Sequence, residues 1–203
     1  PLVEVKTPVV SIAIDEISFE YYTDFISIAD GETNTINTDE VVLVGYGIKD
    51  ARYNDYKELD VRGKVVIAIG GEPKDSLGVY NVSGSEENSK WSNGRQELSS
   101  KRNAAKDLGA KAFFLINQSL FQRYSTYYKA REERGGESNL ALDVKEDPMY
   151  GFLVSEEMGS KLLNTTTIKI DFEQISKPIT SENVAAMIKG SEKPDEYVIL
   201  SAH

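Results

Sequence analysis

The sequence has no cysteine and only one histidine, His203, which is its last residue. The absence of cysteine excludes disulfide scaffolds, thiolate zinc sites and cysteine nucleophiles. A single histidine excludes a complete metal site built from several histidines of this chain, and also a serine–histidine site with its histidine in mid-chain. No apolar run approaches the roughly 18 residues that a membrane-spanning helix requires, so no transmembrane segment is predicted.

Positive charge is also scarce, because 23 Lys and Arg stand against 33 Asp and Glu, for a net charge of −10. This balance argues against a nucleic-acid partner, since phosphate binding depends on Lys and Arg. A length of 203 residues fits one large domain or two small ones. A chain of this length can bury enough surface to fold without disulfide cross-links. The chain does not begin with Met, which favours a fragment or a processed product over a whole gene product.

Short apolar or alternating segments predict strands, bounded by turn residues. These segments are 9–14, 17–28, 41–48, 65–69, 111–117, 149–154 and 166–173. The polar segments 30–40 and 74–93 are expected to be loops, the second one long and exposed.

Helices are predicted between several of these strands. A helix over about 94–108 ends at Gly109, so that residues 64–117 form a parallel strand–helix–strand crossover. The segment 120–138 fits a short helix or an ordered flap. Ser155 is a plausible N-cap for a short helix that ends near Leu163.

Two further strand-like segments, 183–190 and 196–203, follow a boundary near Lys177 and Pro178. The second has no stop signal, so the chain is expected to be truncated inside this region. His203 stands at the carboxyl end of that strand, where ligands gather in α/β sheets, and a neutral imidazole suits a metal ligand. The sequence lacks complete versions of other functional motifs. Gly45 and Gly47, for example, lack the third glycine of a dinucleotide-binding fingerprint.

The last 21 residues, "NVAAMIKGSEKPDEYVILSAH", resemble the opening of the catalytic domain in zinc-dependent aminopeptidases of peptidase clan MH. The matching positions are Asn183, Val184, Gly190, Asp195, Glu196, Val198 and Ala202. His203 falls on the family's first zinc ligand. The resemblance implies an intact enzyme with two zinc ions, in which metal-bound water attacks the peptide bond after a substrate's first residue.

The preceding segment resembles the protease-associated domain that is often inserted just before that point. The similar stretches are "LVGYGI", "YNDYKELDVRGKVVIAIGGEP", "KRNAAKDLGAKAFFLIN" and "YGFLVSEEMGSKLL". The implied organisation is lead-in strands at 1–39, a protease-associated domain at 40–177 and the first strands of a truncated catalytic domain at 178–203. The implied fold class is α+β: a β-rich barrel or sandwich flanked by two or three helices, plus two strands of an incomplete α/β zinc-peptidase domain.

The resemblance also implies an activity, a location and a role for this chain. The remaining zinc ligands and the general base would lie beyond His203, so the chain alone is expected to be inactive. The family suggests an extracytoplasmic location and a peptide or protein substrate. The inserted domain is expected to shape substrate access or to bind partners.

Four aromatic residues are candidates for such a contact surface: Trp91, Tyr124, Tyr127 and Tyr128. The alternative is that they pack in the core or under loops. The strands within 183–203 would have unpaired edges, so a dimer through them is expected as a consequence of truncation.

Two other classes of protein remain open. One is a non-catalytic binding module of a receptor-like relative without a working metal site. The other is a protease-associated domain inserted in a serine peptidase, which the sequence after Pro178 fits poorly.

Overall fold

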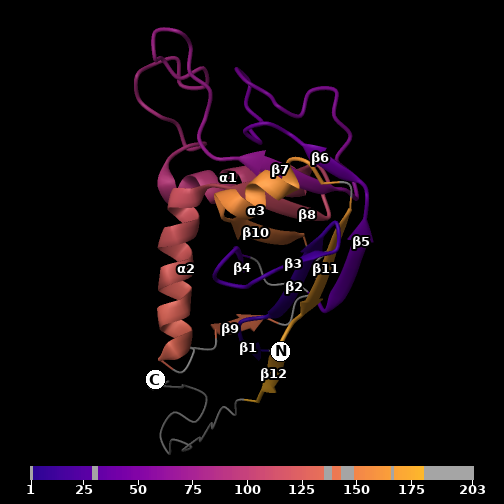
Figure 1. Cartoon of the computed structure of the whole chain (residues 1–203). Coiled ribbons are helices and arrows are strands. Elements are labelled where there is room, and N and C mark those ends of the chain that lie inside the picture. Colours follow the sequence, from indigo (N-terminus) through magenta and orange to yellow (C-terminus); the bar gives the residue numbers. More distant parts are fainter. Residues whose placement is uncertain (1, 29–31, 135–138, 143–148, 166, 181–203) are drawn as a thin grey trace, which may run out of the picture.

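The computed structural model of the chain describes residues 2–28, 32–134, 139–142, 149–165 and 167–180. These residues form three helices and three β-sheets, one of them mixed, which confirms the predicted α+β class (Figure 1). His203 and the two strands predicted within 183–203 lie outside the described residues. The expected dimer through those strands therefore stays a prediction.

A mixed five-stranded sheet forms the centre of the fold. Its order is β4 (Phe25–Ser27), β10 (Tyr150–Val154), β8 (Ala112–Ile116), β7 (Val65–Ile69) and β6 (Val41–Leu43). The last four strands run parallel, and β4 is antiparallel to β10. The connection from β7 to β8 runs through helix α1 (Gly94–Asp107), which confirms the predicted parallel crossover.

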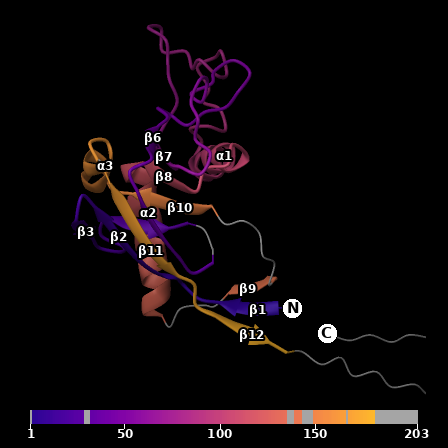
Figure 2. The same ribbon diagram turned by 90° about the vertical axis from the view of Figure 1, so that its right-hand side faces the viewer.

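Two antiparallel sheets complete the fold. One has the order β3 (Ile17–Phe19), β2 (Val9–Ile14), β11 (Ile168–Glu173) and β5 (Asn34–Thr38). The other has the order β12 (Ser176–Ile179), β1 (Leu2–Val5) and β9 (Asn139–Leu142), and it lies at the end of the molecule opposite the long loops (Figure 2).

The central sheet is covered on both faces, which makes a three-layered core. One face packs against α1 and α2 (Gln118–Glu133), and the other packs against the four-stranded sheet and α3 (Glu156–Leu162). The first face presents Val66, Ala68, Phe113 and Leu115, and the second presents Val65, Ile67, Phe114 and Phe152. Because neither face meets water, β7 and β8 are apolar at every position rather than at alternate positions.

Three strand predictions need correction. Residues 34–38 form β5, although the predicted element is a loop, because Ile36 is buried and the backbone pairs with β11. The predicted strand 41–48 ends at Leu43, since Gly45 and Gly47 adopt positive φ angles of 62° and 69°. The predicted strand 17–28 is divided into β3 and β4 by a turn that contains Tyr22 at φ 68°.

Residues before position 40 share sheets with residues after it. β2 pairs with β11, β4 with β10, and β1 with β12. Strands β2, β4 and β5 therefore belong to the same three-layered core as the segment that resembles a protease-associated domain, whereas β1 lies in the separate three-stranded sheet. The predicted division into 1–39, 40–177 and 178–203 stays a prediction about domain organisation.

The carboxyl ends of β7, β8 and β10 meet at one edge of the central sheet. Asn117 follows β8 and caps α2 by accepting a hydrogen bond from Leu120 N at 3.1 Å. Ser155 follows β10 and caps α3 by accepting one from Met158 N at 3.2 Å, which confirms the predicted cap. Gly70 follows β7 and begins the loop that leads to α1.

Candidate functional site

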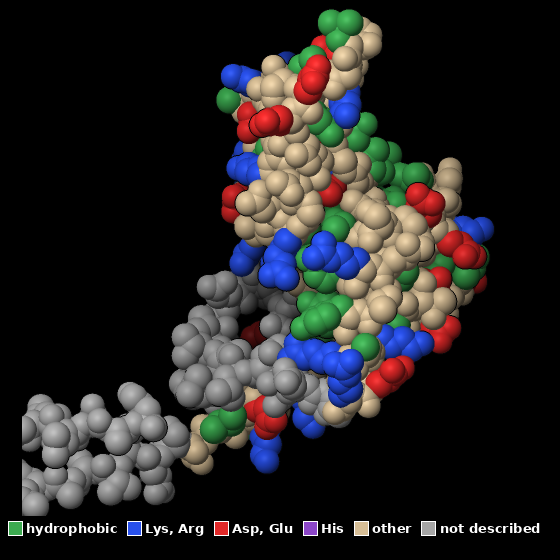
Figure 3. Space-filling model, turned by 90° about the vertical axis from the view of Figure 1, so that its left-hand side faces the viewer, with side chains coloured by type: hydrophobic (Ala, Val, Ile, Leu, Met, Phe, Trp, Pro, Cys, Tyr) green, Lys and Arg blue, Asp and Glu red, His purple; other side chains and the backbone are tan. Residues whose placement is uncertain are grey.

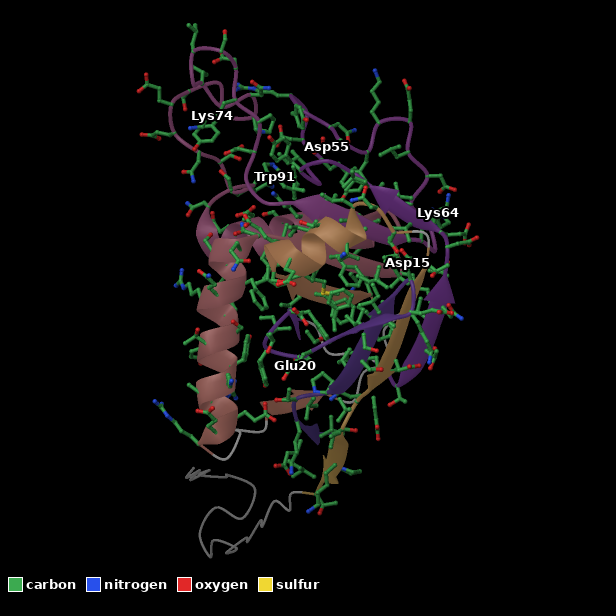
Figure 4. The ribbon with its side chains drawn as sticks, viewed as in Figure 1. Asp15, Glu20, Asp55, Lys64, Lys74 and Trp91 are labelled. Atoms are coloured by element: carbon green, nitrogen blue, oxygen red, sulfur yellow. The ribbon has the colours of Figure 1, made fainter. Side chains whose placement is uncertain are left out.

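The structure separates the four aromatic residues that were predicted to form a contact surface. Trp91 is only 3% exposed and belongs to the core between the sheet and α1. Its Nε1 donates to Asp50 Oδ2 at 3.5 Å, and it lies where the projecting loops meet the body of the protein (Figure 4). Trp91 therefore anchors the loop 74–93, as the alternative of core or loop packing predicts, and it is not an accessible contact residue.

The three tyrosines instead line a groove between α1 and α2, with a volume of about 650 Å³. Tyr124 and Tyr128 are stacked, with ring centroids 6.2 Å apart and planes inclined by 22°. Tyr127 meets Tyr128 edge to face at 5.3 Å and is 60% exposed. These rings form one continuous aromatic surface on α2.

Both helices contribute residues to the lining of the groove, and these residues have the same spacing on each helix. On α1 the lining residues are Arg95, Leu98, Ser99 and Arg102, at i, i+3, i+4 and i+7. On α2 they are Tyr124, Tyr127, Tyr128 and Arg131, again at i, i+3, i+4 and i+7, with Arg123 beside them. Residues at this spacing share one helix face, so the groove is lined by two facing stripes.

The groove is basic although the protein as a whole is acidic. Of the ten described residues that line it, four are arginines and the other six are uncharged, whereas the chain has a net charge of −10. Figure 3 shows the face that carries α2, where Lys and Arg side chains gather beside hydrophobic ones. Glu132 of α2 accepts a hydrogen bond from Tyr22 Oη and is not among the described residues that line the groove.

The surroundings of Tyr128 in the groove shift the pKa of its hydroxyl. Partial burial raises the pKa of its hydroxyl, and the neighbouring tyrosines act in the same direction. The positive charges of Arg131 and Arg95 oppose the rise in pKa. Arginines from both helices thus act on one ring in the groove.

A second polar cluster lies at the carboxyl edge of the parallel strands and is sealed from water. Lys101 of α1 is fully buried, and its Nζ donates to the carbonyl oxygens of Ile69 at 2.9 Å and Gly71 at 2.6 Å. Its third contact is Glu97 Oε1 at 2.9 Å. Burial lowers the pKa of Lys101, and the attraction of Glu97 opposes this shift.

Glu97 completes the cluster. Its Oε1 accepts a hydrogen bond from Gly71 N at 2.6 Å, and its Oε2 accepts one from Asn117 Nδ2 at 3.2 Å. Because Lys101 and Glu97 are 0% and 3% exposed and are bonded to the strand ends, they hold α1 against β7 and β8. This arrangement fits a structural clamp, since no substrate atom can reach either charge.

The loop after β7 is tied down in a similar way. The carboxylate of Glu72, which is 7% exposed, accepts hydrogen bonds from Ser89 N, Ser89 Oγ and Ser92 Oγ at 2.6 to 2.7 Å. The base of the loop 74–93 is thereby fixed, while Leu77 farther out is 84% exposed. The structure bears out the prediction of a long exposed loop in this segment.

The predicted metal ligand, His203, lies outside the described residues. Within the part of the chain that the structure describes, no group of three or more His, Asp or Glu side chains is placed to hold a metal ion. In the same part, no helix is both long and apolar enough to cross a membrane.

Sequence reasoning missed the arginines of the groove and the clamp. The arginines carried a usable signal, because they repeat with apolar or aromatic residues at helical spacing on two helices. The sequence contains no comparable signal for the buried pair Glu97 and Lys101. Glu97 and Lys101 are spaced i, i+4, as in many exposed ion pairs, and nothing in that spacing indicates burial.

Comparisons with known proteins give distant structural similarity only. No protein-family model matches the chain, and no curated protein matches it. Among solved structures, the chain is similar to BSAP, a zinc aminopeptidase from Bacillus subtilis, with a TM-score of 0.43, 12% identity and 86% of this chain covered. A second structure of BSAP gives a TM-score of 0.41 and 13% identity over 85% of this chain.

The subtilisin-like protease Apa1 from the Antarctic psychrotroph Pseudoalteromonas sp. AS-11 is also similar, with a TM-score of 0.45 and 11% identity over 83% of this chain. The chain spans about a third of the length of each of these structures, 33% in every case. The similarity therefore concerns one segment of two different kinds of protease.

Proposed function

We propose that this chain is the accessory, protease-associated region of a secreted zinc-dependent aminopeptidase, which removes N-terminal residues from peptides. The observation that carries the proposal is the sequence from Asn183 to His203, whose pattern resembles the start of the catalytic domain in such enzymes. His203 takes the place of the first zinc ligand in that pattern.

The order of elements supports the accessory role. The segments that resemble a protease-associated domain fold into β7, α1, β8, β10 and α3, which belong to one core. This packed core carries the loop 74–93 and the groove between α1 and α2. In the proposed enzyme this region shapes substrate access or binds partners.

Chemistry would be supplied by zinc in the longer protein. A bound zinc ion polarises a peptide carbonyl and lowers the pKa of water. Of this chain's residues, only His203 is proposed as a ligand, and the described residues hold no further set that fits a metal. The chain alone is therefore expected to lack aminopeptidase activity.

The test is an aminopeptidase assay on a longer protein that continues past His203. A panel of chromogenic aminoacyl substrates is used with and without a chelator, and this 203-residue chain is the control. Turnover that the chelator abolishes, with none by the control, is the expected result. A folded, zinc-loaded longer protein without turnover on any substrate would instead indicate a receptor-like binding module.

A further inference from the structure

We propose that the groove between α1 and α2 binds an extended acidic peptide segment of a partner protein, held by Arg95, Arg102, Arg123 and Arg131. This inference goes beyond the proposed function. It depends only on residues of this chain and holds whether or not the longer protein is a peptidase.

The charge of the groove selects the chemistry of the ligand. Guanidinium groups match carboxylates in shape and form paired hydrogen bonds with them. Arg95 and Arg102 approach from α1, whereas Arg123 and Arg131 approach from α2, so a ligand between the helices meets positive charge from both sides. Among the described residues that line the groove none is acidic, and the four arginines give this part of the lining a positive charge.

The length of the groove favours a peptide over a small anion. At about 1.5 Å of rise per residue, the arginines at positions 123 and 131 lie roughly 12 Å apart along α2. An extended peptide advances by about 3.3 Å per residue, so three or four residues would span that distance. A single small anion would reach only part of the set.

The aromatic and apolar lining suits the rest of such a peptide. The rings of Tyr124, Tyr127 and Tyr128 present flat surfaces with polar tips, which is how tyrosine serves at protein interfaces. Leu98 and Ile28 add apolar surface on the other wall and floor. The ring of Tyr128 is partly buried, whereas the ring of Tyr127 is 60% exposed and therefore open to a ligand.

A glycine keeps the floor of the groove in its present shape. A Cβ atom at Gly151 of β10 would lie 3.0 Å from Ile28 Cγ1 and 3.3 Å from Arg102 Nε. Both distances are shorter than ordinary van der Waals contacts. Ile28 and Arg102 thus occupy space that a larger residue at position 151 would take from them.

The net charge of the chain argues against a polyanion of the nucleic-acid class. A long polyphosphate would extend past the groove onto a surface that is acidic overall, since the chain carries −10. A short acidic segment meets only the local positive field.

The test is a fluorescence-polarisation titration of this chain with a labelled octapeptide that contains four glutamates and two leucines. The control peptide has glutamine in place of glutamate. We expect saturable binding of the acidic peptide, weakened at raised salt, and at least tenfold weaker binding of the glutamine peptide.

Two matched variants locate the site. Arg95→Gln with Arg123→Gln removes two exposed arginines of the groove, and roughly tenfold weaker binding is expected. Lys57→Gln with Lys177→Gln makes the same change in net charge at exposed positions that do not line the groove, and unchanged binding is expected. Tyr127→Ala keeps the charge and is expected to weaken binding severalfold through lost contact area.

Several results would overturn the proposal. They are no binding of the acidic peptide, equal binding of the glutamine peptide, or equal weakening by the two double variants. Tighter binding of a single-stranded oligonucleotide than of the peptide would assign the groove to nucleic acid. Binding that appears only after the acidic residues within 137–147 are neutralised would assign it to this chain's own acidic segment. The aminopeptidase assay is read separately, so failure here leaves the proposed function unaffected.

Discussion

Replacement of Lys101 by methionine is the sharpest test of the buried clamp. The substitution keeps the unbranched shape and most of the volume of the side chain but removes the terminal ammonium group. The carbonyl oxygens of Ile69 and Gly71 lose their donor, and the carboxylate of Glu97 loses its counter-ion. Because Glu97 is only 3% exposed, water cannot replace the missing charge.

The expected cost follows from that geometry. Removing one partner of a buried ion pair destabilises proteins by about 3–5 kcal/mol, since the other charge is left buried and unpaired. Glu97 keeps two donors, Gly71 N and Asn117 Nδ2, which lessens the penalty. We therefore expect Lys101→Met to lower the free energy of unfolding by about 3 kcal/mol.

The assay is urea unfolding at pH 7, followed by circular dichroism. The control is the double variant Lys101→Met with Glu97→Gln, which removes both charges and leaves an amide oxygen for Gly71 N. It should lose less stability than Lys101→Met alone, by about 1 kcal/mol or more. A loss below about 1 kcal/mol for Lys101→Met, or a double variant that is less stable than the single one, would refute the account of the clamp.

The remaining predictions concern capping, an unpartnered hydroxyl and pH. Ser155→Ala removes the cap that accepts from Met158 N, so thermal unfolding should show a loss of about 1 kcal/mol, with Ser155→Asp retaining most of the stability. Tyr56 Oη is buried without a hydrogen-bond partner among the described residues, so Tyr56→Phe should leave the urea midpoint unchanged or raise it. Burial raises the pKa of Tyr21 from 10.0 to about 12, against the opposing hydrogen bond from Ser27 N. Its protonated form thus stabilises the folded state fully below pH 10, and this contribution is lost as pH rises to 12. Tyr21→Phe should accordingly show a shallower fall in stability between pH 10 and 12 than the unsubstituted protein, and an equal slope would contradict the assignment.

The central layer of the fold was predictable because its signals are local. β7 and β8 are unbroken apolar runs, and Gly109 follows the helix between them. The cap at Ser155 has acidic residues in the first turn of α3, which is typical of a helix start. Each of these features appears within a few residues of sequence.

The elements that were missed depend on partners far away in the chain. β5 has the sequence "NTINT", which contains a single apolar residue, and it forms a strand because β11, at least 130 residues away in the chain, pairs with it. β12 contains Pro178 and pairs with β1 at the opposite end of the described chain. Polar or interrupted segments of this kind carry no periodicity from which pairing can be inferred.

The candidate site was also predictable only in part, because some of its residues are neighbours in the sequence and others are brought together by packing. The tyrosines of α2 stood out as a cluster, but the sequence alone did not distinguish their partly exposed face from the buried position of Trp91. Arg95 and Arg102 belong to another helix, and only the packing of α1 beside α2 brings them to the tyrosines. A groove between two elements is a tertiary feature, and a single stretch of sequence contains only half of it.

The most direct test of the proposed function is the zinc content of the longer protein with and without His203. Purified protein that continues past this residue is dialysed against metal-free buffer, and its zinc is measured by mass spectrometry together with its turnover of aminoacyl substrates. We expect His203→Ala to lose bound zinc and turnover together, while circular dichroism shows that the protein remains folded. Unchanged zinc content and turnover in that variant would contradict the assignment of His203 as a ligand and the proposed function that rests on it.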